Sequence, residues 1–81
     1  MNREEILSKV TESFESVLEH DDFKLTDETT AQDVDGWESI THMMIISDIE
    51  KKFNIKFKLM DLMNMNDIGD LLKTIETEVD K

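Results

Sequence analysis

The chain of 81 residues contains no cysteine, no proline and only two glycines, and its nine basic residues face twenty acidic ones. The absence of cysteine excludes a disulfide framework, a thiolate zinc site and a cysteine nucleophile, so any thiol chemistry depends on a cofactor. No apolar run approaches the roughly 18 residues that a membrane span needs, and the residues after Met1 lack a signal-peptide core. We therefore expect no membrane insertion and a cytoplasmic location.

The shortage of basic residues gives a formal net charge of −11. A surface this acidic repels phosphates, which excludes nucleic acid and anionic membranes as partners and favours basic protein surfaces. The acidic residues are concentrated in the first half, where residues 1–38 contain twelve acidic and three basic residues. A chain of this length buries only about 60 to 65% of its unfolded surface, so we expect one small domain, 1–81, without a deep enzyme cleft.

Helical periodicity dominates the chain. Apolar residues recur at spacings of three and four in three segments, which predict helices from Arg3 to Leu18, over 39–53, and up to about Glu78. Asn66 or Asp67 is the predicted N-cap of the last of these helices. The apolar segment 57–65 is short and predicts one or two helical turns. The sequence shows no β-type alternation, so it predicts an all-α fold with three principal helices plus one short helix.

Residues 19–38 lack a sustained period and predict a long loop after the first helix. Such a loop in a compact domain is unusual unless it is functional or belongs to the architecture. We expect it to be anchored to the core by its apolar side chains, which are Phe23, Leu25, Ala31, Val34 and Trp37.

A turn signal precedes the second predicted helix. Asp35-Gly36 is a turn dipeptide, and the sequence after Ser39 has no glycine or proline as far as Phe53. Ser39 is therefore predicted in the first helical turn, where unpaired N–H groups and the helix dipole favour an anion such as a phosphate ester. The simpler alternative is that Glu38 or Ser39 only caps the helix.

The segments Trp37-Glu38-Ser39-Ile40, 48–53 and Asn54-Ile55-Lys56-Phe57 together resemble the acyl carrier protein family. The resemblance covers nearly the whole chain, although Glu38-Ser39-Ile40 stands where the family has Asp-Ser-Leu. It implies a small four-helix bundle of acyl-carrier type, in which the long first loop is part of the architecture. It also implies that Ser39 carries a 4′-phosphopantetheine arm, which a phosphopantetheinyl transferase donates from coenzyme A.

The same resemblance implies a monomeric carrier that has no catalytic residues of its own. Such a carrier holds acyl or related intermediates as thioesters and delivers them to acyl-loading and acyl-processing enzymes of fatty acid or polyketide biosynthesis. These partners would have basic or apolar docking patches.

The helix after Ser39 has more apolar residues than one core-facing stripe requires. Ile45, Ile49 and Phe53 repeat at a spacing of four with Ile46 beside them and form the predicted core stripe. Three further apolar residues are either buried on other sides or exposed as a patch for partners. With Glu38, they form the predicted partner surface: Glu38, Ile40, Met43 and Met44.

This helix departs from the fatty-acid-synthesis carriers that it resembles. Thr41 and Met44 stand where those carriers commonly have acidic residues, and Lys51 and Lys52 stand where further acidic residues often lie. Fewer acidic residues would relax the choice of partner. We therefore expect a specialised biosynthetic pathway with dedicated enzymes.

Two other interpretations concern a catalytic pair and a calcium site. Ser39 and His42 lie three residues apart, as a nucleophile and its base could. A hydrolase would also need an orienting acid, an oxyanion hole and a pocket, and the chain is too small to supply the pocket, so we expect no catalysis. His42 could instead approach a phosphate on Ser39.

The segment Asp33-Val34-Asp35-Gly36 is similar to part of a calcium loop. In the register set by Gly36, however, Ala31 and His42 occupy the first and last ligand positions, so no metal site is expected. A calcium-sensor-like module or an acidic helical adaptor remains the alternative function.

Overall fold

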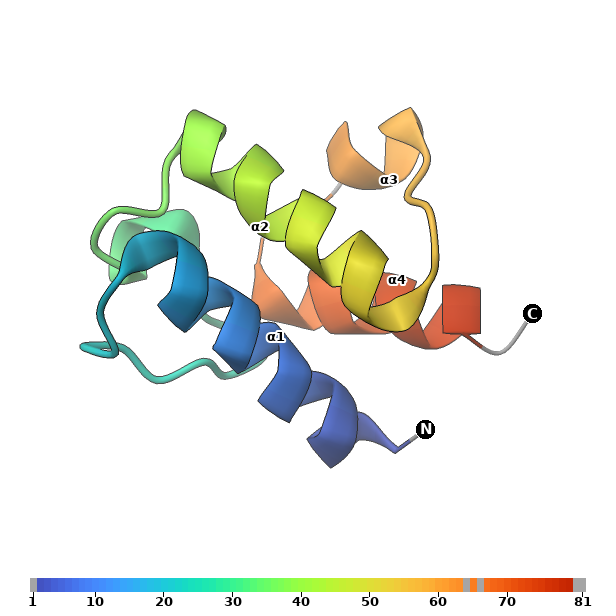
Figure 1. Cartoon of the computed structure of the whole chain (residues 1–81), viewed down its shortest axis with the longest axis horizontal. Helices are drawn as coiled ribbons and strands as arrows, with labels where there is room; N and C mark the ends of the chain where they lie inside the picture. Colours follow the sequence, from blue (N-terminus) through green and yellow to red (C-terminus); the bar gives the residue numbers. More distant parts are fainter. Residues whose placement is uncertain (1, 64, 66, 80–81) are drawn as a thin grey trace.

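The computed structural model describes residues 2–63, 65 and 67–79, and all regular secondary structure in this part of the chain is helical (Figure 1). The elements in order are α1 (Arg3–Leu18), a single 3₁₀ turn η1 (Ala31–Asp33), α2 (Ser39–Phe53), α3 (Leu59–Met63) and α4 (Ile68–Val79). The prediction of three principal helices, one short helix and a long loop after the first helix is confirmed.

Local capping explains where the helices begin and end. The side-chain oxygen of Asn2 accepts a hydrogen bond from the Glu5 N–H at 2.8 Å, which satisfies a free donor at the start of α1. Glu19 and Asn54 end α1 and α2 in the left-handed conformation, with φ of 60° and 54°. Asp67 is bonded to the Asp70 N–H at 2.9 Å, as expected of an N-cap for α4.

The alternative cap for α4, Asn66, lies outside the described residues. The helix itself continues to Val79, one residue beyond the predicted end.

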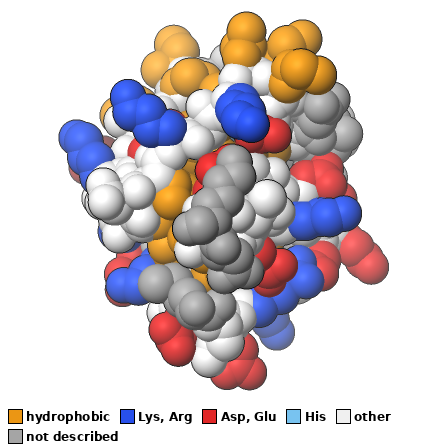
Figure 2. Space-filling view, turned by 90° about the vertical axis from the view of Figure 1, so that its right-hand side faces the viewer, with side chains coloured by type: hydrophobic (Ala, Val, Ile, Leu, Met, Phe, Trp, Pro, Cys, Tyr) orange, Lys and Arg blue, Asp and Glu red, His pale blue; other side chains and the backbone are white. Residues whose placement is uncertain are grey.

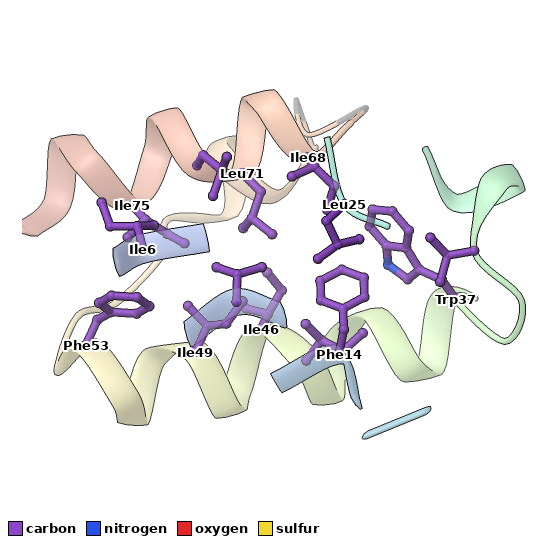
Figure 3. Packing of buried hydrophobic residues seen from close by; sticks show 14 residues of the cluster. Ile6, Phe14, Leu25, Trp37, Ile46, Ile49, Phe53, Ile68, Leu71 and Ile75 are labelled. Atoms are coloured by element: carbon purple, nitrogen blue, oxygen red, sulfur yellow. The ribbon is translucent and has the colours of Figure 1, made fainter. Parts of the chain in front are cut away.

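The core lies between α1, α2 and α4, and α1 packs against both of the other helices. The predicted stripe of α2, Ile45, Ile46, Ile49 and Phe53, is buried. Figure 3 shows its labelled members facing side chains of α1 and α4 across the cluster. The buried residues of the other two helices are Ile6, Val10 and Phe14 in α1, and Ile68, Leu71, Leu72 and Ile75 in α4.

The long loop is fixed to the core at four of its five predicted anchors. Leu25, Val34 and Trp37 are buried, and Phe23 is partly buried against the cluster. The prediction for Ala31 is wrong, because this residue begins η1 on the surface and is exposed.

Backbone hydrogen bonds join the loop to the start of α4. The N–H groups of Ile68 and Gly69 donate to the carbonyl oxygens of Thr29 and Asp27, both at 2.9 Å. A Cβ atom on Gly69 would lie 2.9 Å from the Asp27 oxygen, so a larger residue would push the loop away. Glycine at this position therefore permits the close approach that holds the loop.

A buried polar contact connects α1 to α2. The hydroxyl of Ser13 is fully buried and donates to the Asp48 carboxylate at 2.6 Å. Lys52 lies beside the same pair, with Nζ 3.5 Å from Asp48 and 3.8 Å from Glu12, and it also donates to the Lys9 carbonyl oxygen at 3.3 Å. Lys52 is therefore directed at α1.

Candidate functional site

The turn before α2 is held against the core by an aromatic contact. Gly36 has φ of 88°, a conformation that glycine adopts without strain, and it lets the chain reverse before Trp37. The indole ring of Trp37 is buried and packs edge-to-face on Phe14, with ring centroids 4.9 Å apart. In Figure 1 this turn lies near η1 and the end of α1, at the end of the molecule away from the N and C labels.

The hydroxyl of Thr41 fixes the backbone of the turn. Its oxygen accepts a hydrogen bond from the Glu38 N–H at 2.7 Å and donates to the Gly36 carbonyl oxygen at 2.6 Å. Thr41 thus satisfies one donor and one acceptor at the entry to α2. The sequence indicates Thr41 only as a surface position where carriers have an acidic residue, and does not reveal this role.

Ser39 is the first residue of α2 and is exposed, and Glu38 precedes it as the N-cap residue. Of the two simpler capping candidates, Glu38 therefore occupies the cap position, and Ser39 is left with its hydroxyl at the surface. The first turn of α2 contains no acidic residue. Within α2 itself no side chain therefore competes for the positive end of the helix dipole with an anion attached at Ser39, and the neighbouring carboxylate belongs to the cap residue Glu38.

His42 is engaged with the aromatic anchor of the turn. The indole N–H of Trp37 donates to Nδ1 of His42 at 3.0 Å, and the two rings stack with an interplanar angle of 29°. Burial lowers the pKa of His42 below its ordinary value of 6.5, so the imidazole is neutral at pH 7. Because Nδ1 accepts this bond, Nε2 carries the proton, and His42 has no free lone pair to act as a base for Ser39.

A groove opens beside Ser39. Its volume is about 490 Å³, and side chains from the turn, α2, α3 and the segment after α3 line it. Its lining is mainly apolar, and it extends from Ser39 and Glu38 towards α3. The other lining residues are Ala31, Trp37, His42, Met43, Leu62 and Met65.

The three surplus apolar residues of α2 are exposed. Ile40 is 77% exposed, and Met43 and Met44 are 53% and 52% exposed, so burial on other sides does not absorb them. Exposure of all three is therefore confirmed, while their role in binding partners remains a prediction.

The short helix α3 exposes three more large apolar side chains that the sequence analysis did not assign to a surface. Leu59, Met60 and Met63 are each more than 70% exposed. The signal available in the sequence was the density of apolar residues over 57–65, since so short a helix could not bury all of them.

The two lysines of α2 differ in position. Lys51 is exposed, as expected of a surface position, whereas Lys52 is bound to α1 through Asp48 and Glu12. Lys52, which stands where carriers often have a further acidic residue, is therefore directed at α1. Since Asp48 and Lys52 are four residues apart, they lie on one side of the helix, and that side faces α1.

No group of three or more histidine or acidic side chains is arranged to hold a metal ion within residues 2–63, 65 and 67–79. In the segment that is similar to a calcium loop, the Asp33 carboxylate instead accepts a hydrogen bond from the Thr30 N–H at 3.0 Å. None of the helices in the described part is long and apolar enough to cross a membrane.

Comparison with known proteins places this arrangement in a family. Residues 8–75 match the family described as "Phosphopantetheine attachment site". The chain is 30% identical to an acyl carrier protein of Exiguobacterium sibiricum and 32% identical to one of another Exiguobacterium strain. Each alignment covers 98% of this chain and 100% of the relative.

A solved structure supports the same relationship. The solution structure of a holo acyl carrier protein from Geobacter metallireducens superposes with a TM-score of 0.85 at 35% identity. The match covers 93% of this chain and 86% of that protein.

Proposed function

The chain belongs to the acyl carrier proteins, non-catalytic proteins with a covalently attached phosphopantetheine arm, and we propose that Ser39 is the residue that holds this arm. The observation that supports this assignment best is the position of the Ser39 hydroxyl, exposed at the first residue of α2 beside an apolar groove.

The other serines lack this combination. Ser8 and Ser16 are exposed within α1, Ser47 is exposed in the middle of α2, and Ser13 is buried against Asp48. Only Ser39 among the five serines, all of which are described, lies at a helix N-terminus. There the unpaired N–H groups of α2 would stabilise the phosphodiester of the arm.

The groove beside Ser39 suits a flexible, largely apolar group. Met43 and Leu62 supply apolar surface on two of its sides, and His42 presents a neutral ring. When bound, the arm supplies the thiol that forms thioesters with acyl groups, which this chain lacks because it has no cysteine. Trp37, Thr41 and Gly36 hold Ser39 in place through the contacts of the turn.

In this proposal, residues 1–81 act as one carrier domain that a phosphopantetheinyl transferase loads. The loaded protein then delivers acyl intermediates to partner enzymes of a specialised pathway. The specialised role is supported by the exposed side of α2, where Met44 stands in place of an acidic residue that is common in fatty-acid-synthesis carriers, and where Ile40 and Met43 are exposed as well.

The assignment of Ser39 is tested by loading the unmodified protein with coenzyme A and a broad-specificity phosphopantetheinyl transferase. Intact mass spectrometry should show one phosphopantetheine on the native protein and on Ser47→Ala, and none on Ser39→Ala. Ser47 is the matched control, because it is an exposed serine on the same helix. A mass increment on Ser39→Ala would overturn the assignment.

A further inference from the structure

One face of the molecule combines exposed apolar side chains with basic residues. We define the α2–α3 face by its exposed apolar residues Ile40, Met43 and Met44 of α2 and Leu59, Met60 and Met63 of α3. Figure 2 shows hydrophobic side chains gathered along the top of the molecule with Lys or Arg side chains directly below them. A patch of this kind is typical of a protein-binding surface.

The segment 39–63, which contains α2 and α3, has a net charge opposite in sign to that of the rest of the chain. Residues 39–63 contain three acidic and four basic residues, whereas the remainder contains seventeen acidic and five basic residues. A partner that approaches the α2–α3 face therefore meets a segment that lacks the excess of acidic residues found in the rest of the chain.

All three acidic residues of this region are bonded within the chain. Asp48 accepts from Ser13 and lies beside Lys52, which directs it towards α1. Glu50 accepts from the Phe57 N–H at 2.9 Å, and Asp61 accepts from the Lys58 N–H at 3.3 Å. Their carboxylates hold α2, the following loop and α3 together, although Glu50 also lines the hollow that Lys51 and Lys56 share.

Three exposed lysines, Lys51, Lys56 and Lys58, lie between the apolar residues of α2 and those of α3 in the sequence. Lys51 is exposed one helical turn beyond Ser47, which itself follows Met44 by three residues on α2. Lys51 and Lys56 line a common hollow of about 370 Å³. Lys58 is also exposed and directly precedes Leu59, the first residue of α3.

From this arrangement we propose that the α2–α3 face binds a partner protein whose docking site is apolar at its centre and carries carboxylates where Lys51, Lys56 and Lys58 lie. This inference rests on the proposed carrier function and specifies its partners, for which it replaces the basic docking patches expected from the net charge by acidic ones. The apolar residues supply contact area that adaptable methionine side chains fit to the partner. The lysines select an acidic rim over a basic one and steer the encounter.

The test uses two amphipathic helical peptides of identical leucine content. One has glutamates flanking its apolar face, and its twin has lysines at the same positions. Fluorescence anisotropy measures affinity for the holo protein, and amide chemical shifts locate the site. We expect the glutamate peptide to bind on α2 and α3 at least about tenfold more tightly than its twin binds there, with affinity falling as salt is added.

A matched pair of double variants isolates the lysines. Lys56→Glu/Lys58→Glu should weaken the glutamate peptide at least about fivefold, since charge pairs at an exposed rim have modest individual effects. Lys24→Glu/Lys73→Glu introduces the same charge change at exposed positions of the long loop and α4 and should leave affinity nearly unchanged. Equal weakening by both variants, or equal or tighter binding of the lysine peptide on α2 and α3, would overturn the proposal.

Two further measurements separate the remaining outcomes. Both double variants should still accept phosphopantetheine on Ser39; if the native protein accepts none there, the carrier assignment fails independently of the peptide results. Sedimentation of the holo protein alone should show a monomer. A dimer that Lys56→Glu/Lys58→Glu dissociates would identify the occupant of the face as a second copy and overturn the proposed partner.

Discussion

The indole N–H of Trp37 and Nδ1 of His42 form a 3.0 Å hydrogen bond that joins the turn before Ser39 to the second turn of α2. Trp37 also packs on Phe14 of α1, so this single bond connects the site to the core. The bond requires a neutral imidazole, because a protonated His42 would have a hydrogen on Nδ1.

The first prediction concerns pH. Burial lowers the pKa of His42, so as pH falls through 6.5 the unfolded chain binds more protons at this residue than the folded chain does. The His42 contribution to stability is therefore full above pH 6.5 and decreases below it until the folded pKa is passed. An NMR titration of the His42 imidazole should show that Nδ1 gains its proton with a pKa below 6.5.

Urea unfolding checks the energetic side of this prediction. The fall in unfolding free energy between about pH 7.5 and pH 5 should be smaller in His42→Asn than in the native protein, because asparagine does not titrate. An equal fall in both would show that protonation of His42 does not affect the fold.

The second prediction concerns Thr41. Thr41→Val keeps the shape of the side chain but removes the bonds to the Glu38 N–H and the Gly36 oxygen, so we expect a loss of about 1 to 3 kcal/mol in unfolding free energy. Loading of Ser39 should also slow, because the turn is no longer fixed. Thr41→Ser retains the hydroxyl and should restore both properties. A Thr41→Val protein with native stability and loading rate would contradict this role.

The course of α1, α2 and α4 could be predicted because each helix has enough turns for its apolar period to be read, and the α2 stripe ending at Phe53 is buried as that period requires. Contacts between distant residues could not be predicted in this way. Ser13 and Asp48 are separated by 35 residues, and nothing in either segment indicates their pairing. The direction of Lys52 follows from that pairing, so it was also missed.

The candidate site likewise has some features that the sequence predicts and others that it does not. The turn dipeptide and the uninterrupted sequence after Ser39 place this residue at the start of a helix, and the structure agrees. In contrast, α3 has only five residues, too few to define a buried side, so the exposure of Leu59, Met60 and Met63 was not apparent. Ala31 was predicted as an anchor because it is apolar, but a methyl group gains little from burial and does not fix the orientation of η1.

The third prediction concerns salt. Twenty acidic residues share this small molecule with nine basic ones, and the ion pairs of Arg3 and Lys52 are partly exposed and therefore weak. Added salt should screen the repulsion within a Debye length of about 10 Å at 0.1 M and raise the melting temperature. Calorimetry over a salt series checks this. Melting temperatures that stay flat would show that pairing already neutralises the charges.

The last prediction concerns the pathway. General fatty-acid-synthesis enzymes present basic patches to acidic carriers, as the family resemblance implies. In this chain Met44 stands where those carriers commonly have an acidic residue, and the exposed Ser47 follows it by three residues on the same side of α2. We expect the loaded native protein to be a poor substrate for such enzymes. Met44→Glu/Ser47→Glu should raise its turnover several-fold through the encounter rate, since each added pair is worth about 0.2 to 1 kcal/mol. Thr41 is left unchanged because its hydroxyl fixes the turn.

The control adds the same two charges elsewhere, at Ser16 of α1 and Thr77 of α4, both exposed. Ser16→Glu/Thr77→Glu should leave turnover near the native value, because net charge alone would raise long-range attraction without forming pairs at the docking site. A native protein that already matches a housekeeping carrier, and gains nothing from Met44→Glu/Ser47→Glu, would refute the specialised pathway. The loading of Ser39 would be unaffected by that result, because transfer of the arm depends on the turn before α2 rather than on Met44 and Ser47.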